Sequence, residues 1–518
     1  MIGVLAAVTL AAYGFELAHL GAALDDDYWE LAGFTAPKWV REGRWGLHLL
    51  KTVLFPDRMP PLIPMLLGLA FSIAGILLLL RAWGIASRAQ QIGFGAVALT
   101  FPGTVFSYVL PILGYGIGIG YFCIGLSLYM YARAVGHRKL MAFLPAAFAI
   151  AIYQQLLMAL AMAFLIHLAL LAFRKEPALG RHAAAIAAVN LLAIATYALG
   201  ARLFLAIYAT TPSPYITGRV ELATLTSDPV RVLRGTMDAI LAVYLGRTAA
   251  YGLRIPLMGI LIGTALVGFA AHVWGLQRSP TVKLGLFATA LLIMLPPFGL
   301  GALTGGVLRM RWLPSLPMAV AGVTLLATLE TRRAYRLVLT GVVVVAVFQF
   351  IQVTNRLFAS SHLALEADRV LAARIIDRLE AARTSLPEGS RPVYLQIVGY
   401  LEREPTELMP RAGDTVGYSI FESADTTWIA AFLGMLGYRE LQPVPAEGQF
   451  EMIERAEALP AWPEHGSVAI MGDTLVLNLG GQTAPQKFTL CLQLGMAGSA
   501  EFDRLCAHEI WRPGLSGQ

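Results

Sequence analysis

Charge is what this sequence lacks most. Only 14% of its 518 residues are Asp, Glu, Lys or Arg, whereas about 25% is usual in soluble domains. A soluble chain of this length would need more charge to cover its surface, and 57% of the residues here are hydrophobic. The apolar residues come in runs of roughly 15–25, long enough at 1.5 Å per residue to cross a hydrocarbon core about 30 Å thick. The composition therefore excludes an ordinary soluble protein and predicts a polytopic α-helical membrane protein.

Several sequence features are also missing, and their absence limits the possible functions. No basic stretch is interleaved with aromatic side chains, which excludes a nucleic-acid partner. The cysteines and histidines show no spacing typical of a metal site. Cys123 lies within an apolar run, where it is expected to pack, whereas Cys491 and Cys506 lie near the C-terminus, where a disulfide and two free thiols are both open. The N-terminus lacks the basic segment and small-residue cleavage site of a signal peptide, so its apolar run is expected to be retained as a first helix.

Eleven apolar runs predict about eleven transmembrane helices, within a transmembrane domain 1–353 that precedes an α/β domain 354–518. The predicted spans are 2–24, 62–80, 92–110, 112–131, 140–153, 156–173, 183–208, 255–274, 284–300, 313–329 and 337–351. The run 140–173 would be about 50 Å long as one helix, too long for one span. Dividing it at Gln154 and Gln155 keeps every later basic loop on one side of the membrane.

Lys and Arg set the predicted orientation. Five loops that hold almost no acid alternate with loops that carry Asp and Glu, and the positive-inside rule puts the basic loops in the cytoplasm. The N-terminus is then cytoplasmic, and the C-terminal domain is periplasmic if the membrane is a bacterial inner membrane. The five loops contain Arg81 and Arg88; Arg133, Arg138 and Lys139; Arg174, Lys175 and Arg181; Arg278 and Lys283; and Arg332, Arg333 and Arg336.

Two of the outer loops, 25–60 and 211–251, are long and are predicted to hold interfacial helices. The first is rich in tryptophan (Trp29, Trp39 and Trp45), and its stretch 39–55 has apolar residues at helical spacing. In the second, Ser227-Asp228-Pro229 provides a helix cap and a proline at the first helical position. In the C-terminal domain the pattern predicts helices at 366–383 and 426–436, strands at 392–398 and 487–494, and a hairpin at 467–479 turning at Gly472-Asp473.

Candidate chemistry begins with Asp25, Asp26 and Asp27, directly after the first span. Three adjacent carboxylates repel one another, which raises the pKa of at least one and suits it to exchange a proton. The alternative is a solvated helix end. Glu16 and His19 lie one helical turn apart in the first span, where ionisable groups are usually functional. A buried pair that only packs is the alternative for these two.

The second candidate group is cationic. Arg202, Arg254, Arg309 and Arg311 lie at the predicted outer side, and Gly43-Arg44 follows the acidic triplet in the first outer loop. A single interfacial arginine often only extends its head group into water. Together these residues run against the positive-inside bias and predict a lipid phosphate or pyrophosphate ligand, whose oxygens match the guanidinium fork.

The order of these features resembles the GtrII-type O-antigen glucosyltransferases, within the wider GT-C superfamily of membrane glycosyltransferases. Asp27, a third acid, departs from the family pattern and leaves open which carboxylate takes the catalytic place. The residues that carry the resemblance are Asp25-Asp26, Gly43-Arg44, Tyr153-Gln154, Arg309 or Arg311, Asn355, Asp368 and the stretch 417–425 before a helix.

The resemblance implies a GT-C-like fold and an enzyme that takes a sugar, glucose or another hexose, from a polyprenyl-phosphate carrier. The acceptor would be a glycan or lipid-linked glycan such as the O-antigen of lipopolysaccharide, on the outer face of the inner membrane. Transfer is expected to invert the anomeric centre, with Asp25 or Asp26 as general base. The expected substrate-binding residues are Asp27, Glu16, His19, Arg44, Tyr153, Gln154, Arg202, Arg254, Arg309 and Arg311.

The sequence leaves alternatives open for the cofactor and for the class of protein. No cofactor is established, and a divalent cation, Mg²⁺ or Mn²⁺, at Asp25 and Asp26 stays open because some GT-C enzymes need one and others do not. A transporter or flippase of lipid-linked sugars would also need outer arginines, but no internal repeat or pair of broken helices supports it. A polysaccharide polymerase or ligase is the alternative within the enzyme class.

Overall fold

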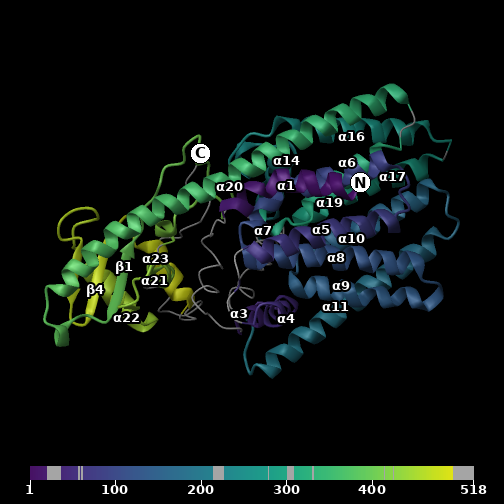
Figure 1. The fold of residues 1–518 in the computed structure, drawn as a ribbon. Coiled ribbons are helices and arrows are strands. Elements are labelled where there is room, and N and C mark those ends of the chain that lie inside the picture. The colour runs from purple at the N-terminus through teal and green to yellow at the C-terminus, as the bar shows by residue number, and fades with distance from the viewer. Residues whose placement is uncertain are drawn as a thin grey trace. The chain divides into compact units, whose positions relative to one another are not determined.

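The computed structural model describes residues 1–19, 37–56, 59, 62–213, 227–277, 279–299, 309–329, 332–413, 415–423 and 425–493. Asp25, Asp26 and Asp27 lie outside these ranges. The chain forms two compact units (Figure 1). Among the described residues, the first unit holds the chain up to Ser360 with Pro410–Val416, and the second holds Ser361–Met409 with the chain from Gly417 onward.

Seven helices in the described ranges are long and apolar enough to cross a membrane by length and composition, and α5, α8 and α10 run alongside one another in Figure 1. They are α1 (Ile2–His19), α5 (Leu62–Ala82), α8 (Pro111–Arg133), α10 (Leu156–Phe173), α11 (Leu179–Ile207), α16 (Pro256–Gly275) and α20 (Arg333–Thr384). Glycines allow α5 and α8 to approach closely. A Cβ on Gly118 would lie 2.0 Å from the Gly68 carbonyl oxygen, the kind of contact by which small residues join membrane helices.

The other four predicted spans coincide with shorter helices. These are α6 (Arg88–Thr100), α9 (Phe143–Ile152), α17 (Pro280–Met294) and α19 (Leu316–Ala327). The predicted span 92–110 is interrupted, because Pro102 follows Phe101 and a residue before proline avoids the α-region. Phe101 has ψ 123°, and η1 (Pro102–Thr104) and α7 (Val105–Tyr108) follow it. The predicted division of 140–173 is confirmed, since α9 ends at Ile152, Tyr153 is extended, and α10 begins at Leu156.

The predicted helix at 39–55 is instead two short helices, α3 (Pro37–Arg41) and α4 (Trp45–Leu54). They are separated by a turn at Gly43, whose φ of +73° lies in the left-handed region that glycine adopts without strain. The predicted helix after Asp228 is confirmed as α14 (Pro229–Tyr244), followed by α15 (Thr248–Tyr251). The Asp228 side chain caps α14 by accepting a bond from the Arg231 backbone N–H at 3.1 Å.

α20 is one helix of 52 residues. The sequence predicted a span at 337–351 and a separate helix at 366–383, and the separation was wrong. Its sequence contains no proline and one glycine, so nothing in it stops a helix between the two. In the first unit, the Tyr335 hydroxyl donates to the Thr264 carbonyl at 3.0 Å, and the Asn355 amide donates to the Ala11 carbonyl at 2.8 Å.

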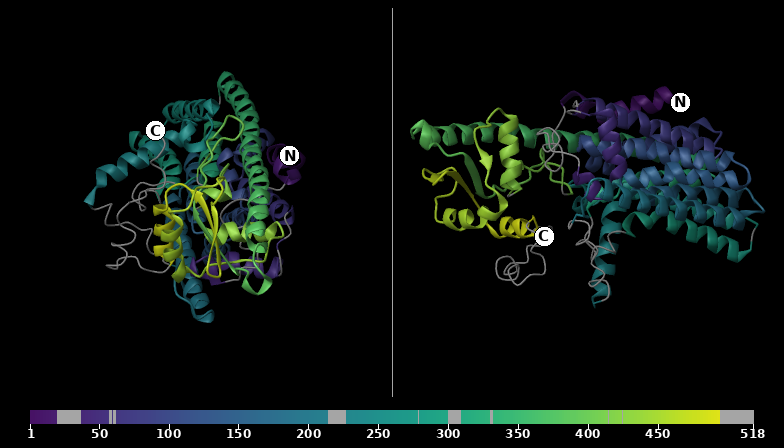
Figure 2. Two further views of the ribbon diagram at one scale, coloured as in Figure 1. Left: turned by 90° about the vertical axis from the view of Figure 1, so that its left-hand side faces the viewer. Right: turned by 90° about the horizontal axis from the view of Figure 1, so that it is seen from below.

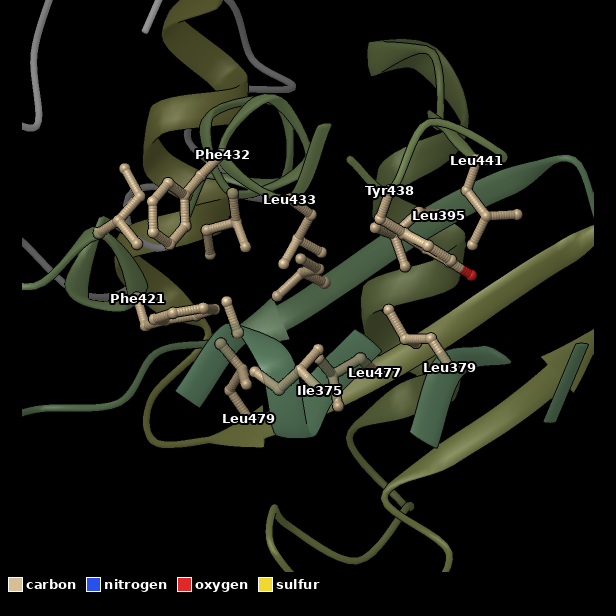
Figure 3. Packing of buried hydrophobic residues seen from close by; sticks show 14 of the residues in the cluster. Ile375, Leu379, Leu395, Phe421, Phe432, Leu433, Tyr438, Leu441, Leu477 and Leu479 are labelled. Carbon is tan, nitrogen blue, oxygen red and sulfur yellow. The ribbon is translucent and has the colours of Figure 1, made fainter. Parts of the chain in front are cut away.

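The second unit contains a four-stranded sheet in the order β2-β1-β4-β3. β1 (Tyr394–Gly399) is parallel to β2 (Gln442–Pro443) and to β4 (Thr474–Gly480), and β3 (Val468–Met471) is antiparallel to β4. Three helices complete it: α21 (Thr426–Met435), α22 (Ala446–Ala456) and α23 (Ala484–Gln493). Side chains of α20, α21 and the sheet form its core, including Ile375, Leu379, Leu395, Phe432 and Leu477 (Figure 3).

Most local predictions for this unit are confirmed. Asp425 caps α21, and β3 and β4 form the hairpin around Gly472, whose φ is +63°. The strand predicted at 487–494 was wrong, because its described part, up to Gln493, belongs to α23. Gln486 accounts for the difference, since it accepts a bond from the Gly399 N–H and donates to the Ile397 carbonyl, a tertiary contact that overrides local strand propensity. Cys491 is buried and disulfide-bonded.

The remaining short elements are 3₁₀ turns. They are η2 (Gly136–Ala142), η3 (Pro296–Phe298), η4 (Met310–Trp312), η5 (Glu388–Ser390) and η6 (Ile420–Glu422).

Candidate functional site

The turn between α3 and α4 is the centre of the candidate site. A Cβ on Gly43 would lie 2.7 Å from the Tyr197 hydroxyl oxygen and 2.9 Å from Gln154 Nε2. Glycine is therefore required twice here, for its positive φ and for the close approach. Gln154 Nε2 donates to the Glu42 carbonyl at 2.7 Å and to the Tyr197 hydroxyl at 3.1 Å. The turn is thus fixed by the α9–α10 junction and by α11.

Arg44 points its guanidinium into a nearly dry environment. Its Nη1 lies 3.2 Å from the Glu42 carboxylate, and the two side chains are 11% and 10% exposed. The guanidinium lies 5.2 Å from the Trp39 ring centroid and 5.0 Å from that of Tyr153. Ion pairs and cation–π contacts strengthen when water is excluded, so this cation is held in one position.

Tyr153 connects Arg44 to a third segment. Its hydroxyl donates to the Arg311 carbonyl at 3.1 Å, and Arg311 is buried in η4, immediately before α19. Arg309 lies beside it, with its guanidinium 5.6 Å from the Trp312 ring centroid. We call Glu42, Gly43, Arg44, Tyr153, Gln154, Tyr197 and Arg311 the Arg44 cluster.

The Arg44 cluster brings together segments that the sequence predicted to lie on one side of the membrane. They are the loop after the first span, the division between α9 and α10, and the segment before α19. Contacts from Arg44 to Tyr153 and from Tyr153 to Arg311 join all three.

α4 anchors the cluster on α11. Trp45 Nε1 donates to the Tyr197 carbonyl at 3.2 Å, and its ring stacks on Phe204 with 5.4 Å between centroids. A Cβ on Gly200 would lie 2.6 Å from the Trp45 ring, so the indole rests directly on the helix backbone. One turn further, His48 Nε2 lies 2.6 Å from the Tyr208 hydroxyl. Burial, with a smaller contribution from Lys51, lowers the pKa of His48 and favours its neutral form.

The other predicted substrate-binding residues lie outside the Arg44 cluster. Glu16 is buried in α1, whereas His19 is exposed and stacks on Phe15 at 4.2 Å, so the two occupy different environments. Arg202 and Arg254 are exposed, as expected for arginines that extend toward water or lipid head groups. Asp25, Asp26 and Asp27 fall outside the described residues.

Sequence reasoning missed Glu42 and Tyr197. Glu42 adjoins the Gly43-Arg44 pair, so its position was a usable signal. Tyr197 is far from Gly43 along the chain, and only tertiary structure brings its hydroxyl to the turn. As for metals, no group of three or more His, Cys, Asp or Glu side chains in the described ranges could hold an ion.

A second buried charge lies in the other unit. Asp368, on α20, accepts bonds from Arg403 Nη2 at 2.8 Å, from the Ser419 hydroxyl at 2.5 Å and from the Ile420 N–H at 2.7 Å. Burial raises the pKa of Asp368 to about 6, although these bonds oppose the rise. We call these four residues the Asp368 node. It fastens the stretch 417–425, which the sequence analysis had singled out, to α20.

Seven candidate spanning helices and a polar cluster built around a buried arginine are features of a polytopic membrane protein. The family model for Glucosyl transferase GtrII matches residues 22–325, and the chain belongs to this family. The resemblance drawn from the sequence is thereby confirmed. The family implies a glucosyltransferase that acts on glycans, with a sugar donor and a glycan acceptor.

The matched residues include the acidic triplet and the whole Arg44 cluster, and they end before Asn355 and Asp368. No curated protein and no solved structure matches the chain.

Proposed function

We propose that this protein transfers a glucosyl group from a polyprenyl-phosphate carrier to a hydroxyl of a surface glycan such as O-antigen, on the outer face of the bacterial inner membrane. The Arg44 cluster is the observation that carries the proposal. It lies within the family-matched residues and holds a desolvated guanidinium at a junction of three predicted outer loops. A guanidinium in such a place suits the phosphate of a lipid-linked sugar.

The proposed reaction is a single displacement of the GT-C type. The acceptor oxygen attacks the anomeric carbon of glucose, the bond from that carbon to the phosphate oxygen breaks, and polyprenyl phosphate leaves with the electron pair. Asp25 or Asp26 takes the acceptor proton as the new bond forms, because a hydroxyl is a poor nucleophile until it loses its proton. One displacement inverts the anomeric configuration.

The reaction also needs positive charge at the leaving phosphate, and arginine side chains supply it. Charge accumulates on the leaving phosphate, and preorganised cations stabilise it best where water is excluded. Arg311 is buried, the Arg44 side chain is only 11% exposed, and Arg309 precedes Arg311 by two residues. We assign these three to the donor phosphate. Asp27, Glu16 and His19, with Tyr153 and Gln154, are proposed to border the sugar and acceptor, while Arg202 and Arg254 contact lipid head groups.

Asp25 and Asp26 are also where a divalent cation would bind if the enzyme uses one. Oxygen ligands of this kind suit Mg²⁺ or Mn²⁺, which would add positive charge at the phosphate.

The test uses purified protein in vesicles with polyprenyl-phosphate glucose, labelled in the glucose, and an O-antigen lipopolysaccharide as acceptor. UDP-glucose serves as the competing donor. We expect the label to move to the glycan only from the lipid donor, with release of polyprenyl phosphate and inverted configuration in the product. Use of UDP-glucose alone would overturn the choice of carrier, and movement of intact labelled lipid across the bilayer would indicate a flippase.

Orientation is tested separately. A reporter that requires export, fused after Gln518, should be active, since the proposed topology has a cytoplasmic N-terminus and a periplasmic C-terminal domain. Activity of a reporter restricted to the cytoplasm at that position would overturn the proposed face of the membrane.

A further inference from the structure

Helix α14 is attached to the first unit chiefly through its C-terminal end. Of its 16 residues, only Val232, Val243 and Tyr244 are buried. The Tyr244 hydroxyl donates to the Met294 carbonyl at 2.5 Å, and its ring packs against Phe298 with 5.4 Å between centroids. In Figure 2 this teal helix runs across the direction of the bundle helices and projects from their side.

The free part of α14 carries an apolar stripe. Val230, Leu233, Met237 and Leu241 are 74%, 66%, 47% and 39% exposed. At 3.6 residues per turn these four share one face of the helix. Single exposed apolar residues are ordinary on a protein surface, but four in register on one helix mark a surface that something covers.

A charged stripe flanks the apolar one. Arg231, Arg234 and Asp238 are exposed and follow one another along the adjacent face, about 90° around the helix axis from the apolar stripe. The buried Val232 and Val243 lie on a third face, toward the protein. The buried Tyr244 lies at the C-terminal end of the apolar stripe, where its ring packs against Phe298 and ends the exposed part of that face. An apolar face with basic residues along its edge is the pattern of a helix lying in a membrane interface.

The neighbouring surface identifies what covers the stripe. α16 is a candidate spanning helix and exposes Ile260 and Val267, at 51% and 67%. α17 exposes Leu291 and Leu292 near the residues that hold α14. The two helices beside α14 thus also expose large apolar side chains, as helices that face lipid do.

We propose that α14 lies in the membrane interface, with its apolar stripe among acyl chains and with Arg231 and Arg234 bound to phosphate groups of anionic phospholipids. The partner is the bilayer itself. Apolar area drives insertion of such helices, and juxtamembrane arginines add attraction to an anionic lipid surface. This inference does not depend on the proposed enzymatic function.

The test places a spin label at two adjacent positions of the full chain, in a Cys123→Ala background, reconstituted in phosphatidylcholine vesicles containing phosphatidylglycerol. Met237→Cys reports on the apolar stripe and Asp238→Cys on the charged stripe. The two labels are at adjacent positions along the helix, so they differ mainly in the face that they occupy. We expect the label at 237 to relax mainly with oxygen, which concentrates in acyl chains, and the label at 238 mainly with a water-soluble nickel chelate.

Two results would overturn the proposal. Nickel-dominated relaxation at both positions would mean that α14 stands in water. Exclusion of both relaxants at 237 would mean that protein, such as a second copy of this chain, covers the stripe.

A separate experiment tests the role of Arg231 and Arg234. Adding phosphatidylglycerol to phosphatidylcholine should deepen the label at 237, and the double change Arg231→Gln and Arg234→Gln should abolish that response. Arg247→Gln, an exposed arginine beyond the end of α14, is the control and should leave the response intact. An unchanged response in the double variant would remove Arg231 and Arg234 from the proposal.

Discussion

Each unit of this protein contains an arginine paired with a buried carboxylate, and the two pairs are built differently. In the Asp368 node, Asp368 is 2% exposed and also accepts bonds from a hydroxyl and a backbone N–H on the stretch 417–425. In the Arg44 cluster the carboxylate, Glu42, belongs to the same turn as the arginine, and aromatic rings flank the guanidinium. The Asp368 node joins segments distant in sequence, whereas the Glu42–Arg44 pair is local and the surrounding residues fix the turn that carries it.

This difference indicates different roles. A carboxylate whose bonds go to the backbone and side chains of another segment holds a fold together. A guanidinium held between rings, on a turn fixed by a glutamine and a tyrosine, is a cation kept in one place. The family match covers the Arg44 cluster and ends before the Asp368 node. We therefore expect changes in the matched region to remove turnover from a folded protein, and changes at the node to remove stability.

The largest effect should fall on the acidic triplet. Asp25→Asn or Asp26→Asn, whichever is the base, should lower turnover by about 10²–10⁴-fold, because a general base contributes about that much. Initial rates of label transfer measure it. Asp27→Asn is the matched control and should cost less. Near-normal turnover in both Asp25→Asn and Asp26→Asn would return the triplet to a solvated helix end.

At the Asp368 node, Asp368→Ala should lower the free energy of unfolding by about 3–5 kcal/mol, since removing one partner of a buried ion pair leaves the other uncompensated. Denaturant unfolding of the full chain in detergent measures it. Turnover per folded molecule should change little. A large loss of turnover without loss of stability would give the node a catalytic role and break the comparison.

The node should also respond to pH. The folded pKa of Asp368, about 6, lies above its ordinary value of 3.8, so the folded protein binds this proton more tightly than the unfolded chain. The contribution of Asp368 to stability is then full below about pH 4 and is lost as pH rises through 6, by at most about 3 kcal/mol. Comparing unfolding free energies of wild type and Asp368→Asn across pH 4–7 isolates it. Identical slopes for the two proteins would contradict the raised pKa.

The smallest effect concerns the support of the Gly43 turn. Tyr197→Phe removes the bond from Gln154 and should cost about 1 kcal/mol of stability, the usual net value of one hydrogen bond. Tyr208→Phe is the matched control, because Tyr208 directly follows α11 and its hydroxyl bonds to His48 on α4. Of the two tyrosines, Tyr197 contacts the turn before Arg44. Tyr197→Phe, but not Tyr208→Phe, should therefore raise the donor KM. Equal donor KM values for the two variants would show that Tyr197 does not position Arg44.

Local patterns predicted much of the fold. Composition and run length located the long apolar helices, Gln154 marked the division of a long apolar run, and Asp228, Asp425 and Gly472 marked two caps and a turn. These features depend on a few adjacent residues, which is why sequence alone reveals them. The continuous α20 and the helical α23 were missed, the latter because its Gln486 bonds to a strand far away in sequence.

In the candidate site, too, the sequence predicted some residues and missed others. Arg44, Tyr153, Gln154 and Arg311 were named from the sequence because their order resembles a family, and the structure joins them. Glu42 and Tyr197 were not named, because their roles depend on the left-handed backbone at Gly43 and on the approach of α11. The spacing of residues along the chain reveals neither the backbone conformation at Gly43 nor the position of α11.

The most direct test of the central claim, that the Arg44 cluster serves the donor phosphate, is the donor dependence of transfer by Arg44→Gln and Arg44→Lys. Truncating one partner of a buried charge pair weakens binding by about tenfold or more. We expect the KM for polyprenyl-phosphate glucose to rise by at least about tenfold in Arg44→Gln, with partial recovery in Arg44→Lys and an unchanged KM for the glycan. Donor KM values equal to wild type in both variants, with turnover retained, would contradict the account.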